Sequence, residues 1–204
     1  SFASTPKIRR NFLNWCCFYS FKNHAEYLRC YNRILLQRNH FLKQSTSASK
    51  AQMSSWNEPF IYYADLIHKE RLLILTQLKE SLQHIWPELS PHFAKDITID
   101  YSQGWPKDKC LKTCLENSIN QDIAYGHTQY GPHRGDLRFK TSEGISIFEY
   151  FSQGQQKLFS YALKFSQMRI LNNSEYESHF LNGVDKNSVK RFFNRELSWI
   201  SFND

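Results

Sequence analysis

The chain has 204 residues, of which 41% are hydrophobic and 22% are charged, so it can bury a core and is not a disordered polypeptide. No apolar run approaches the roughly 18 residues that a membrane span needs, and the first residues lack the basic and apolar regions of a signal peptide. The formal net charge of +7 favours an anionic partner, foremost nucleic acid, over a basic surface without a partner. We therefore expect a cytoplasmic protein with no membrane segment, made of one domain or of parts of one.

The cysteines argue against a disulfide framework and against a zinc site. They number five, and Cys16 and Cys17 are adjacent, which gives no set of paired ligands. Cys110 and Cys114 are four residues apart on a predicted helix, so we expect them to be packing residues. No metal site is predicted.

Two helices are predicted in the first 44 residues. Thr5 and Pro6 have the form of an N-cap and a first helical residue. Asn23 can open a second helix, whose apolar seam consists of Tyr27, Tyr31, Ile34, Phe41 and Leu42. The other face of this helix is basic, with Arg29, Arg33, Arg38 and Lys43. That basic face is either an ordinary solvated surface or a track for DNA.

A Ser-rich connection at residues 44–55 separates this helix from another long one. Apolar residues recur at near-heptad spacing from Phe60 to Ile85, interrupted by Arg71 and Ser81, and Trp86-Pro87 marks the end. Two long amphipathic helices joined by a short polar segment predict an antiparallel hairpin. Such a hairpin is a projecting arm rather than a closed catalytic pocket.

Short extended segments follow the hairpin. Ile97–Tyr101 alternates as a half-buried strand does, and a helix is predicted over 108–122 with Leu111, Leu115 and Ile119 facing inward. Further extended pieces are expected near 124–130 and 137–140, before a turn at 142–144. The chain is thus predicted to be mostly α with a small antiparallel β-sheet, an α+β fold.

The most informative stretch begins at Ser152. Ser152 and Gln155 form the pattern of a capping box, and Leu158, Ala162 and Phe165 follow at helical spacing. A helix that begins here turns its unpaired N–H groups and positive dipole end outward, and Gly154 lets another group approach the backbone. The stretch is therefore either a phosphate clamp or an ordinary capped helix.

Two motifs carry a resemblance to a known family. Residues 152–157, Ser-Gln-Gly-Gln-Gln-Lys, resemble the signature of ATP-binding-cassette ATPases in the form that the RecF family uses. Residues 130–137 resemble the Gly-Pro-His-Arg-x-Asp-Leu segment of the same family, here with Gly131, Pro132, His133, Arg134 and Asp136. Gln37-Arg38-Asn39 and the N-terminal helices also fit the middle of RecF. The resemblance covers Ser1 to Gln167.

The resemblance implies an arm of two long antiparallel helices and the signature-helix lobe of a cassette-type ATPase head. We expect a helical arm at 1–95, a small α+β signature lobe at 96–170 and a non-homologous or fused tail at 171–204. The arm includes a leading short helix.

The resemblance also implies a nucleotide interface shared by two heads. In the intact family one head holds ATP and Mg²⁺, and the other head presents its signature to the γ-phosphate in trans. Ser152, Gln153, Gly154, Gln155 and Gln156 would then contact ATP, although Gln153 stands where many relatives have arginine.

The intact family is a weak ATPase, but these 204 residues contain no Gly-x-x-x-x-Gly-Lys-[Ser/Thr] string and no hydrophobic strand ending in paired acids. We therefore expect this chain alone to hold no cofactor and to be inactive. His133 and Arg134 either support the structure or contact DNA or nucleotide.

The partners implied by the resemblance are single-stranded or gapped duplex DNA, a second RecF head in a homodimer, and recombination mediator proteins. The function implied is that of a DNA recombination and repair mediator. The alternative is a helical protein–protein interaction module without nucleotide binding.

The last fourteen residues, 191–204, instead resemble the N-terminal segment of polyphosphate kinase, or form a coincidental amphipathic helix. They are too few to imply kinase activity. Together with a first residue that is Ser rather than Met, they suggest a fragment assembled from two reading frames joined between Gln167 and Lys190.

Overall fold

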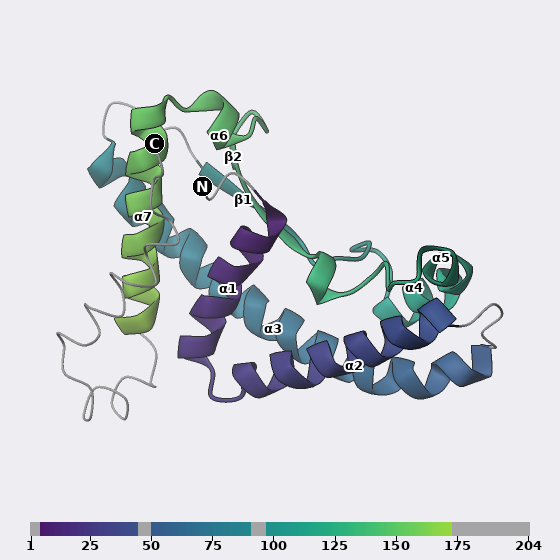
Figure 1. Cartoon of the computed structure of the whole chain (residues 1–204). Helices are drawn as coiled ribbons and strands as arrows, with labels where there is room; N and C mark the ends of the chain where they lie inside the picture. The colour runs from purple at the N-terminus through teal and green to yellow at the C-terminus, as the bar shows by residue number, and fades with distance from the viewer. Residues whose placement is uncertain (1–4, 45–49, 91–96, 173–204) are drawn as a thin grey trace. The chain divides into compact units, whose positions relative to one another are not determined.

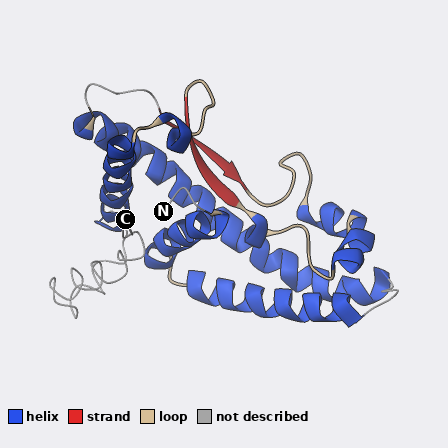
Figure 2. Ribbon diagram, turned by 45° about the horizontal axis from the view of Figure 1, so that its top comes forward, coloured by secondary structure: helices blue, strands red, loops and turns tan. Residues whose placement is uncertain are grey.

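The computed structural model of the chain describes residues 5–44, 50–90 and 97–172. These residues are mostly helical, with one antiparallel sheet of two strands, β1 and β2, as the predicted fold class requires (Figures 1 and 2). None of the helices among the described residues is long and apolar enough to cross a membrane. The predicted polyphosphate kinase-like tail lies outside the described residues.

The helices and strands follow one another along the chain with short connections. In order they are α1 (Pro6–Ser20), α2 (His24–Gln44), α3 (Lys50–Leu89), β1 (Ile97–Ser102), α4 (Leu111–Asn117), α5 (Ile119–Tyr125), the 3-10 helix η2 (Pro132–Arg134), β2 (Asp136–Thr141), α6 (Ile147–Tyr150) and α7 (Gln153–Asn172).

Two compact units share these elements. We call Asn23–Leu73 and Asp100–Leu137 the hairpin unit, and Ser1–Lys22, Ile74–Ile99 and Arg138–Asp204 the signature unit. The units interleave along the chain because α3 contributes residues to both, whereas the three regions predicted from the sequence are consecutive.

The helical hairpin of α2 and α3 is antiparallel, as predicted. Going forward along α2, His24 contacts Glu70, Tyr27 lies against Tyr63, and Tyr31 packs on Phe60. The partners therefore run backward along α3. The connection is shorter than the predicted 44–55, because α3 begins at Lys50.

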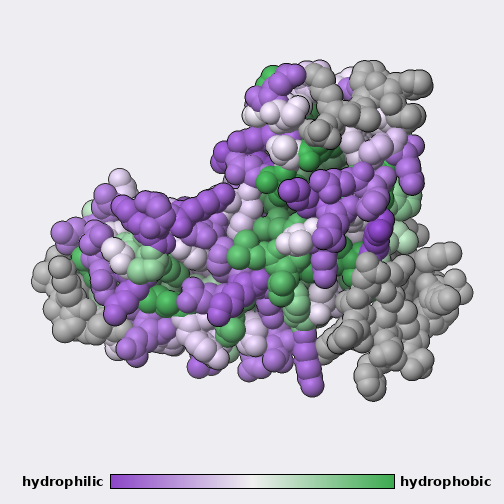
Figure 3. Space-filling view, turned by 180° about the vertical axis from the view of Figure 1, so that it is seen from behind, coloured by the Kyte–Doolittle hydropathy of each residue, from purple (hydrophilic) through white to green (hydrophobic). Residues whose placement is uncertain are grey.

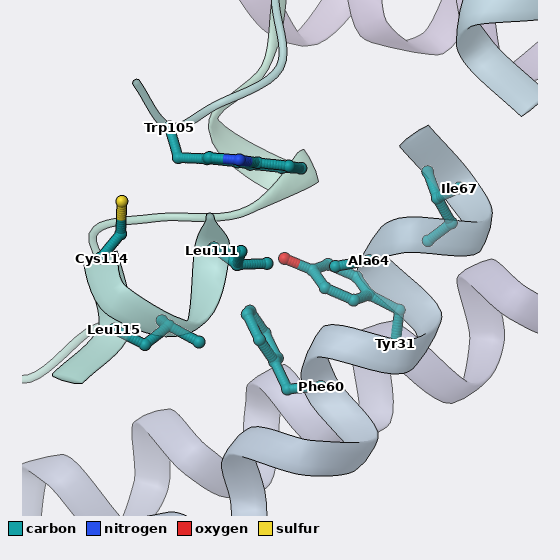
Figure 4. Packing of buried hydrophobic residues seen from close by; sticks show 8 residues of the cluster. All are labelled: Tyr31, Phe60, Ala64, Ile67, Trp105, Leu111, Cys114 and Leu115. Atoms are coloured by element: carbon teal, nitrogen blue, oxygen red, sulfur yellow. The ribbon is translucent and has the colours of Figure 1, made fainter. Parts of the chain in front are cut away.

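The core of the hairpin unit forms where α4 packs against this hairpin (Figure 4). Its buried members are Tyr31, Phe60, Ala64, Ile67, Trp105, Leu111, Cys114 and Leu115. Tyr31 and Phe60 lie with their ring centroids 4.8 Å apart, in a tilted arrangement typical of aromatic pairs. The apolar seams predicted for both long helices thus meet in one cluster.

Two predictions for residues 108–130 are wrong. Instead of one helix over 108–122 there are two, because the chain breaks at Ser118, whose hydroxyl donates to the Leu115 carbonyl. The segment expected to be extended near 124–130 begins inside α5, which ends at Gly126 in the left-handed conformation. Cys110 is exposed and caps α4 by accepting from the Thr113 N–H, so of the two cysteines only Cys114 is a packing residue.

Arg38 does not lie on the solvated basic face predicted for α2. Its side chain and that of Asp122 from α5 are both fully buried (0% exposed), with Nη2 and Oδ2 2.8 Å apart. Arg38 also donates to the Thr128 hydroxyl, and that hydroxyl donates to Asn39 Oδ1. Burial raises the pKa of the Asp122 carboxyl above its ordinary value, and the charge of Arg38 opposes that rise.

The core of the signature unit is aromatic. The ring of Phe159 on α7 lies edge-on to Trp86 and to Phe139, at centroid distances of 5.7 and 5.1 Å. The buried thiol of Cys16 on α1 also contacts this helix: it bonds to the side chain of Gln167, and burial raises the pKa of that thiol to about 12.

The buried face of α7 differs from the predicted one. Ala162 is buried as expected, but Leu158 and Phe165 are exposed, and the helix packs through Phe159, Leu163 and Ile170 instead. Spacing alone could not distinguish the faces, because apolar residues lie on both sides of this helix.

Large hydrophobic side chains also reach the surface. On the face shown in Figure 3, hydrophobic residues form a green area bordered by hydrophilic ones. Over the whole of the described surface, the exposed large hydrophobic and aromatic side chains are those of Phe18, Leu36, Tyr62, Leu72, Leu73, Tyr125, Ile145, Tyr150, Leu158, Tyr161, Phe165 and Met168. Four of the twelve belong to α7.

Replacing Arg38 with Met should lower the free energy of unfolding by about 3–5 kcal/mol, because Asp122 would stay buried without its counter-charge. The loss should depend on pH. Without Arg38 the pKa of Asp122 rises further, so the folded variant binds a proton as the pH falls, and the deficit shrinks between about pH 7 and about pH 4. Urea unfolding across this range measures the effect.

Arg33→Met is the matched control, since Arg33 is exposed on the same helix. It should change the unfolding free energy by less than about 0.5 kcal/mol. A deficit of Arg38→Met that is the same at every pH would mean that lost packing, not the buried charge, is responsible.

Replacing Phe159 with Ala should cost about 3–5 kcal/mol of unfolding free energy, because a fully buried ring leaves a cavity among its aromatic neighbours. The control is Phe165→Ala on the same helix, at a ring that is 48% exposed, where the expected loss is below about 1 kcal/mol. Thermal unfolding followed by near-UV circular dichroism compares the two. Equal losses would contradict the assignment of the buried face.

Candidate functional site

The beginning of α7 is a reciprocal capping box. The Ser152 N–H donates to Oε1 of Gln155 at 2.9 Å, and the Gln155 N–H donates to Oγ of Ser152 at 3.4 Å. These two bonds fix the first turn with no help from other elements. The hydroxyl proton of Ser152 is not used in them, because Oγ only accepts there.

Gln156 secures the chain that leads into α7. Its side-chain amide donates to the carbonyls of Phe148 and Phe151, each at 3.0 Å. Both amide protons are therefore bonded to carbonyls of α6 and of the residue that follows it. Ser160 in turn donates to the Gln156 carbonyl, one turn further along the helix. Gln156 thus holds the turn in place and has no donor left for a ligand.

The first turn of α7 faces solvent. Ser152, Gln153 and Gly154 are exposed, and Gln155 and Gln156 are half-buried. A Cβ placed on Gly154 would meet no atom within 4 Å, so the space above this glycine is open. As in every helix, the first N–H groups have no intrahelical acceptor. The Gln155 N–H is already bonded to Ser152 Oγ, so the groups that can meet an anionic group from outside are the serine hydroxyl, the N–H groups of Gln153 and Gly154, and the open glycine surface.

The Gly131–Asp136 segment, in contrast, is mostly buried in the hairpin unit. Gly131 has φ of +142°, and a Cβ there would overlap the Tyr31 hydroxyl, so only glycine fits this turn. Pro132 starts the 3-10 helix η2 and is buried. Asp136 is also buried and accepts from the Leu137 N–H at 2.9 Å.

His133 has both ring nitrogens occupied. Nε2 donates to the Thr128 carbonyl at 3.1 Å, so the ring proton is on Nε2 and Nδ1 accepts from the Tyr31 hydroxyl at 2.6 Å. Burial raises the pKa of Tyr31 above its ordinary value, which keeps that hydroxyl protonated. These contacts give His133 a structural role in joining the turn to α2.

Arg71 contacts the Gly131–Asp136 segment, and the sequence analysis did not predict this contact. It is 2% exposed, and its Nη1 donates to the Pro132 carbonyl at 2.9 Å, so α3 holds the η2 turn. The sequence did contain a signal for this contact, because Arg71 interrupts an apolar heptad seam. Arg134 follows in the turn and is exposed, which makes it the charged residue of the motif that reaches solvent.

Metal binding finds no support within 5–44, 50–90 and 97–172: no group of three or more His, Cys, Asp or Glu side chains there is placed to hold an ion. The two motifs belong to different units, Ser152–Gln156 to the signature unit and Gly131–Asp136 to the hairpin unit. Only the first presents an uncovered cluster of donors.

Comparison with curated proteins gives a consistent result, although no protein-family model matches the chain. Proteins described as DNA replication and repair protein RecF match from Nitrosococcus oceani (34% identity over 166 residues) and from Acinetobacter baylyi (34% over 194 residues). These matches cover 81% and 93% of the chain but 46% and 53% of the relatives. The second is longer than the 167 residues over which the motifs carried the resemblance.

Comparison with solved structures points to the same family as comparison with the curated relatives. The chain superposes on a RecF bound to an ATP analogue, described as the recombination mediator protein of the RecFOR pathway, with a TM-score of 0.74 and 26% identity. An ATP-bound RecF gives a TM-score of 0.70 and 25% identity. Both comparisons cover 94% of this chain and 55% of the other.

The chain spans about half the length of the relatives that it matches. Over that half, the identity to the curated relatives and the superposition on the solved structures point to one family. The chain therefore belongs to the RecF family.

Proposed function

We propose that this chain supplies the signature side of a shared nucleotide interface in a RecF-type DNA repair protein. The exposed capping box at the start of α7 carries the proposal, because it presents a hydroxyl and backbone N–H groups with no covering side chain over Gly154. ATP, with its Mg²⁺, is held by a partner head, and the γ-phosphate meets this surface from outside.

The residues of the first turn have different roles in this proposal. Ser152 donates its hydroxyl proton to a phosphate oxygen, and Gly154 allows close approach of the backbone. Gln155 and Gln156 hold the turn through the bonds already described. Gln153 is exposed and neutral, so its contact with phosphate lacks the charge assistance that an arginine would give.

The activity and partners of the whole protein follow from the relatives as proposals. We infer that the chain acts with a second RecF head, with single-stranded or gapped duplex DNA, and with recombination mediator proteins. The names of the relatives support repair and replication, and the titles of the solved structures support ATP binding and recombination mediation. Within the 204 residues no phosphate-binding loop is present, so ATP turnover by this chain alone is not expected.

A helical interaction module without nucleotide binding is the second candidate. It is favoured by the hairpin unit, in which the polar residues Arg38, Arg71 and His133 make internal contacts. On that alternative the hairpin docks a protein, and the start of α7 has no ligand.

Gly154→Ala separates a nucleotide contact from a structural role. An added methyl group meets no atom of the chain, so the variant should be as stable as the wild type or more stable by up to about 1 kcal/mol. In the shared interface, however, the methyl group would hold the backbone away from the phosphate. We expect ATP to promote association with RecF of Nitrosococcus oceani, and the variant to lose at least about tenfold of that affinity, or about 1.4 kcal/mol.

Analytical ultracentrifugation with and without Mg²⁺-ATP measures this association. Ser160→Ala is the control, because Ser160 lies one turn further along the same helix and its hydroxyl bonds only to the Gln156 carbonyl, not to the exposed surface of the first turn. ATP-dependent association that Gly154→Ala leaves intact would refute the proposed contact.

DNA titrations distinguish the two candidate functions. If the chain binds nucleic acid through its basic residues, affinity for gapped duplex DNA should fall by about 10³-fold or more between about 50 and 200 mM salt when six or more phosphates are contacted. Arg33→Ala with Lys43→Ala should weaken binding if the exposed face of α2 takes part, whereas Lys79→Ala on α3 serves as the comparison. No binding at low salt would favour the interaction module.

A further inference from the structure

Two cysteines of the hairpin unit lie one helical turn apart in opposite environments. All five cysteines of the chain are among the described residues; Cys16, Cys17 and Cys114 are buried, Cys30 is half-buried, and only Cys110 is exposed. The Cys114 N–H donates to the Cys110 carbonyl at 3.2 Å, across the first turn of α4. We call Cys110 and Cys114 the dithiol pair. One sulfur of the pair is open to solvent, and the other belongs to the core of the hairpin unit.

Thr113 stabilises the ionised form of Cys110. Its hydroxyl oxygen lies 3.0 Å from Cys110 Sγ, and its N–H donates to the same sulfur at 3.5 Å. A thiolate can only accept, so in the ionised state both groups of Thr113 donate to it. The hydroxyl and the N–H lower the pKa of the Cys110 thiol below its ordinary value. Because the thiolate is the nucleophilic form, Cys110 is prepared to react at neutral pH.

Cys114 has the environment that Cys110 lacks. It is 4% exposed and belongs to the same core cluster as Trp105 and Leu111 (Figure 4). Burial raises the pKa of its thiol, an effect that Lys109 opposes and Cys110 adds to. This thiol therefore stays protonated and is shielded from reagents in solvent. An exposed, ionised thiol beside a second thiol that is not itself attacked is the arrangement of a nucleophilic and a resolving cysteine.

The spacing of the dithiol pair allows the two sulfurs to meet. Residues four apart in an α-helix are separated by about 6 Å along its axis, and disulfides join residues whose Cα atoms lie about 4.4–6.8 Å apart. Cys110 is the N-cap of α4 and has extended backbone angles, with φ of −75° and ψ of 150°. No helical turn precedes it, so its side chain is free of the restriction that a preceding turn imposes.

We propose that Cys110 and Cys114 form a redox-sensitive dithiol site whose substrate is a hydroperoxide. The Cys110 thiolate attacks one oxygen of hydrogen peroxide, an S–O bond forms as the O–O bond breaks, and the leaving hydroxide takes up a proton to become water. The product is a sulfenic acid. The Cys114 thiol then attacks the Cys110 sulfur, an S–S bond forms as the S–O bond breaks, and a second water leaves. The two thiols supply the two electrons that the peroxide accepts.

Peptide mapping of the oxidised chain tests the proposal. Trypsin cleaves after Lys109 and Lys112, so Cys110 and Cys114 fall on the separate peptides 110–112 and 113–134. After dilute hydrogen peroxide and alkylation of the remaining thiols, we expect these two peptides to be joined and dithiothreitol to separate them. Cys110 should be oxidised at least about tenfold faster than the half-buried Cys30. The oxidised chain should unfold at a lower urea concentration, because Cys114 leaves the core.

Three variants assign the roles. Cys114→Ala keeps the nucleophile without the resolving thiol, so Cys110 should accumulate as a sulfenic acid that a 1,3-diketone traps. Cys30→Ala is the matched control and should form the disulfide as the wild type does. Thr113→Val removes the hydroxyl donor, so the pH at which the oxidation rate of Cys110 is half-maximal should rise. Circular dichroism checks the folding of each variant.

Three results would overturn the proposal. The first is that the peptides 110–112 and 113–134 are not joined after oxidation. The second is a disulfide that links Cys110 to Cys30 or to Cys110 of a second copy. The third is a Thr113→Val variant whose oxidation rate has the same pH dependence as that of the wild type. No arm of the experiment uses ATP, DNA or a partner head, so its outcome is independent of the proposed nucleotide contact.

Discussion

The two hydrogen bonds exchanged by Ser152 and Gln155 are the constraint on which the candidate site depends. They close the first turn of α7 from within, so no other element has to cover it. The consequence is a helix start whose serine hydroxyl proton and glycine surface remain accessible. Gln156 reinforces the arrangement by holding the preceding segment through two carbonyls. The geometry of the candidate site thus depends on local contacts alone.

The hairpin unit depends on contacts of the opposite kind, between residues far apart in sequence. Arg38 is held by Asp122 and Thr128, and Arg71 fixes the turn at Pro132. Removing either partner leaves a buried charge or carbonyl unsatisfied, which makes these contacts expensive to break. The Gly131–Asp136 segment is consequently held by internal contacts, and Arg134 reaches solvent from it.

Local signals in the sequence predicted local structure well. Thr5 with Pro6, and Ser152 with Gln155, mark helix starts because a cap bonds within three residues of itself. The antiparallel hairpin followed from two apolar seams and a short connection. The buried side of α7 could not be predicted, since both sides are apolar and the choice depends on where Trp86 and Phe139 lie. Burial of Arg38 depends in the same way on Asp122 in a distant helix.

Photo-crosslinking tests the central claim most directly. An ATP analogue with a photoreactive group on its γ-phosphate would be bound to RecF of Nitrosococcus oceani, and the present chain added before illumination. The account predicts crosslinks on this chain within residues 152–156, dependent on the presence of the ATP-holding partner. Crosslinks that fall elsewhere on the chain, or that form equally without the partner, would contradict a signature surface that acts in trans.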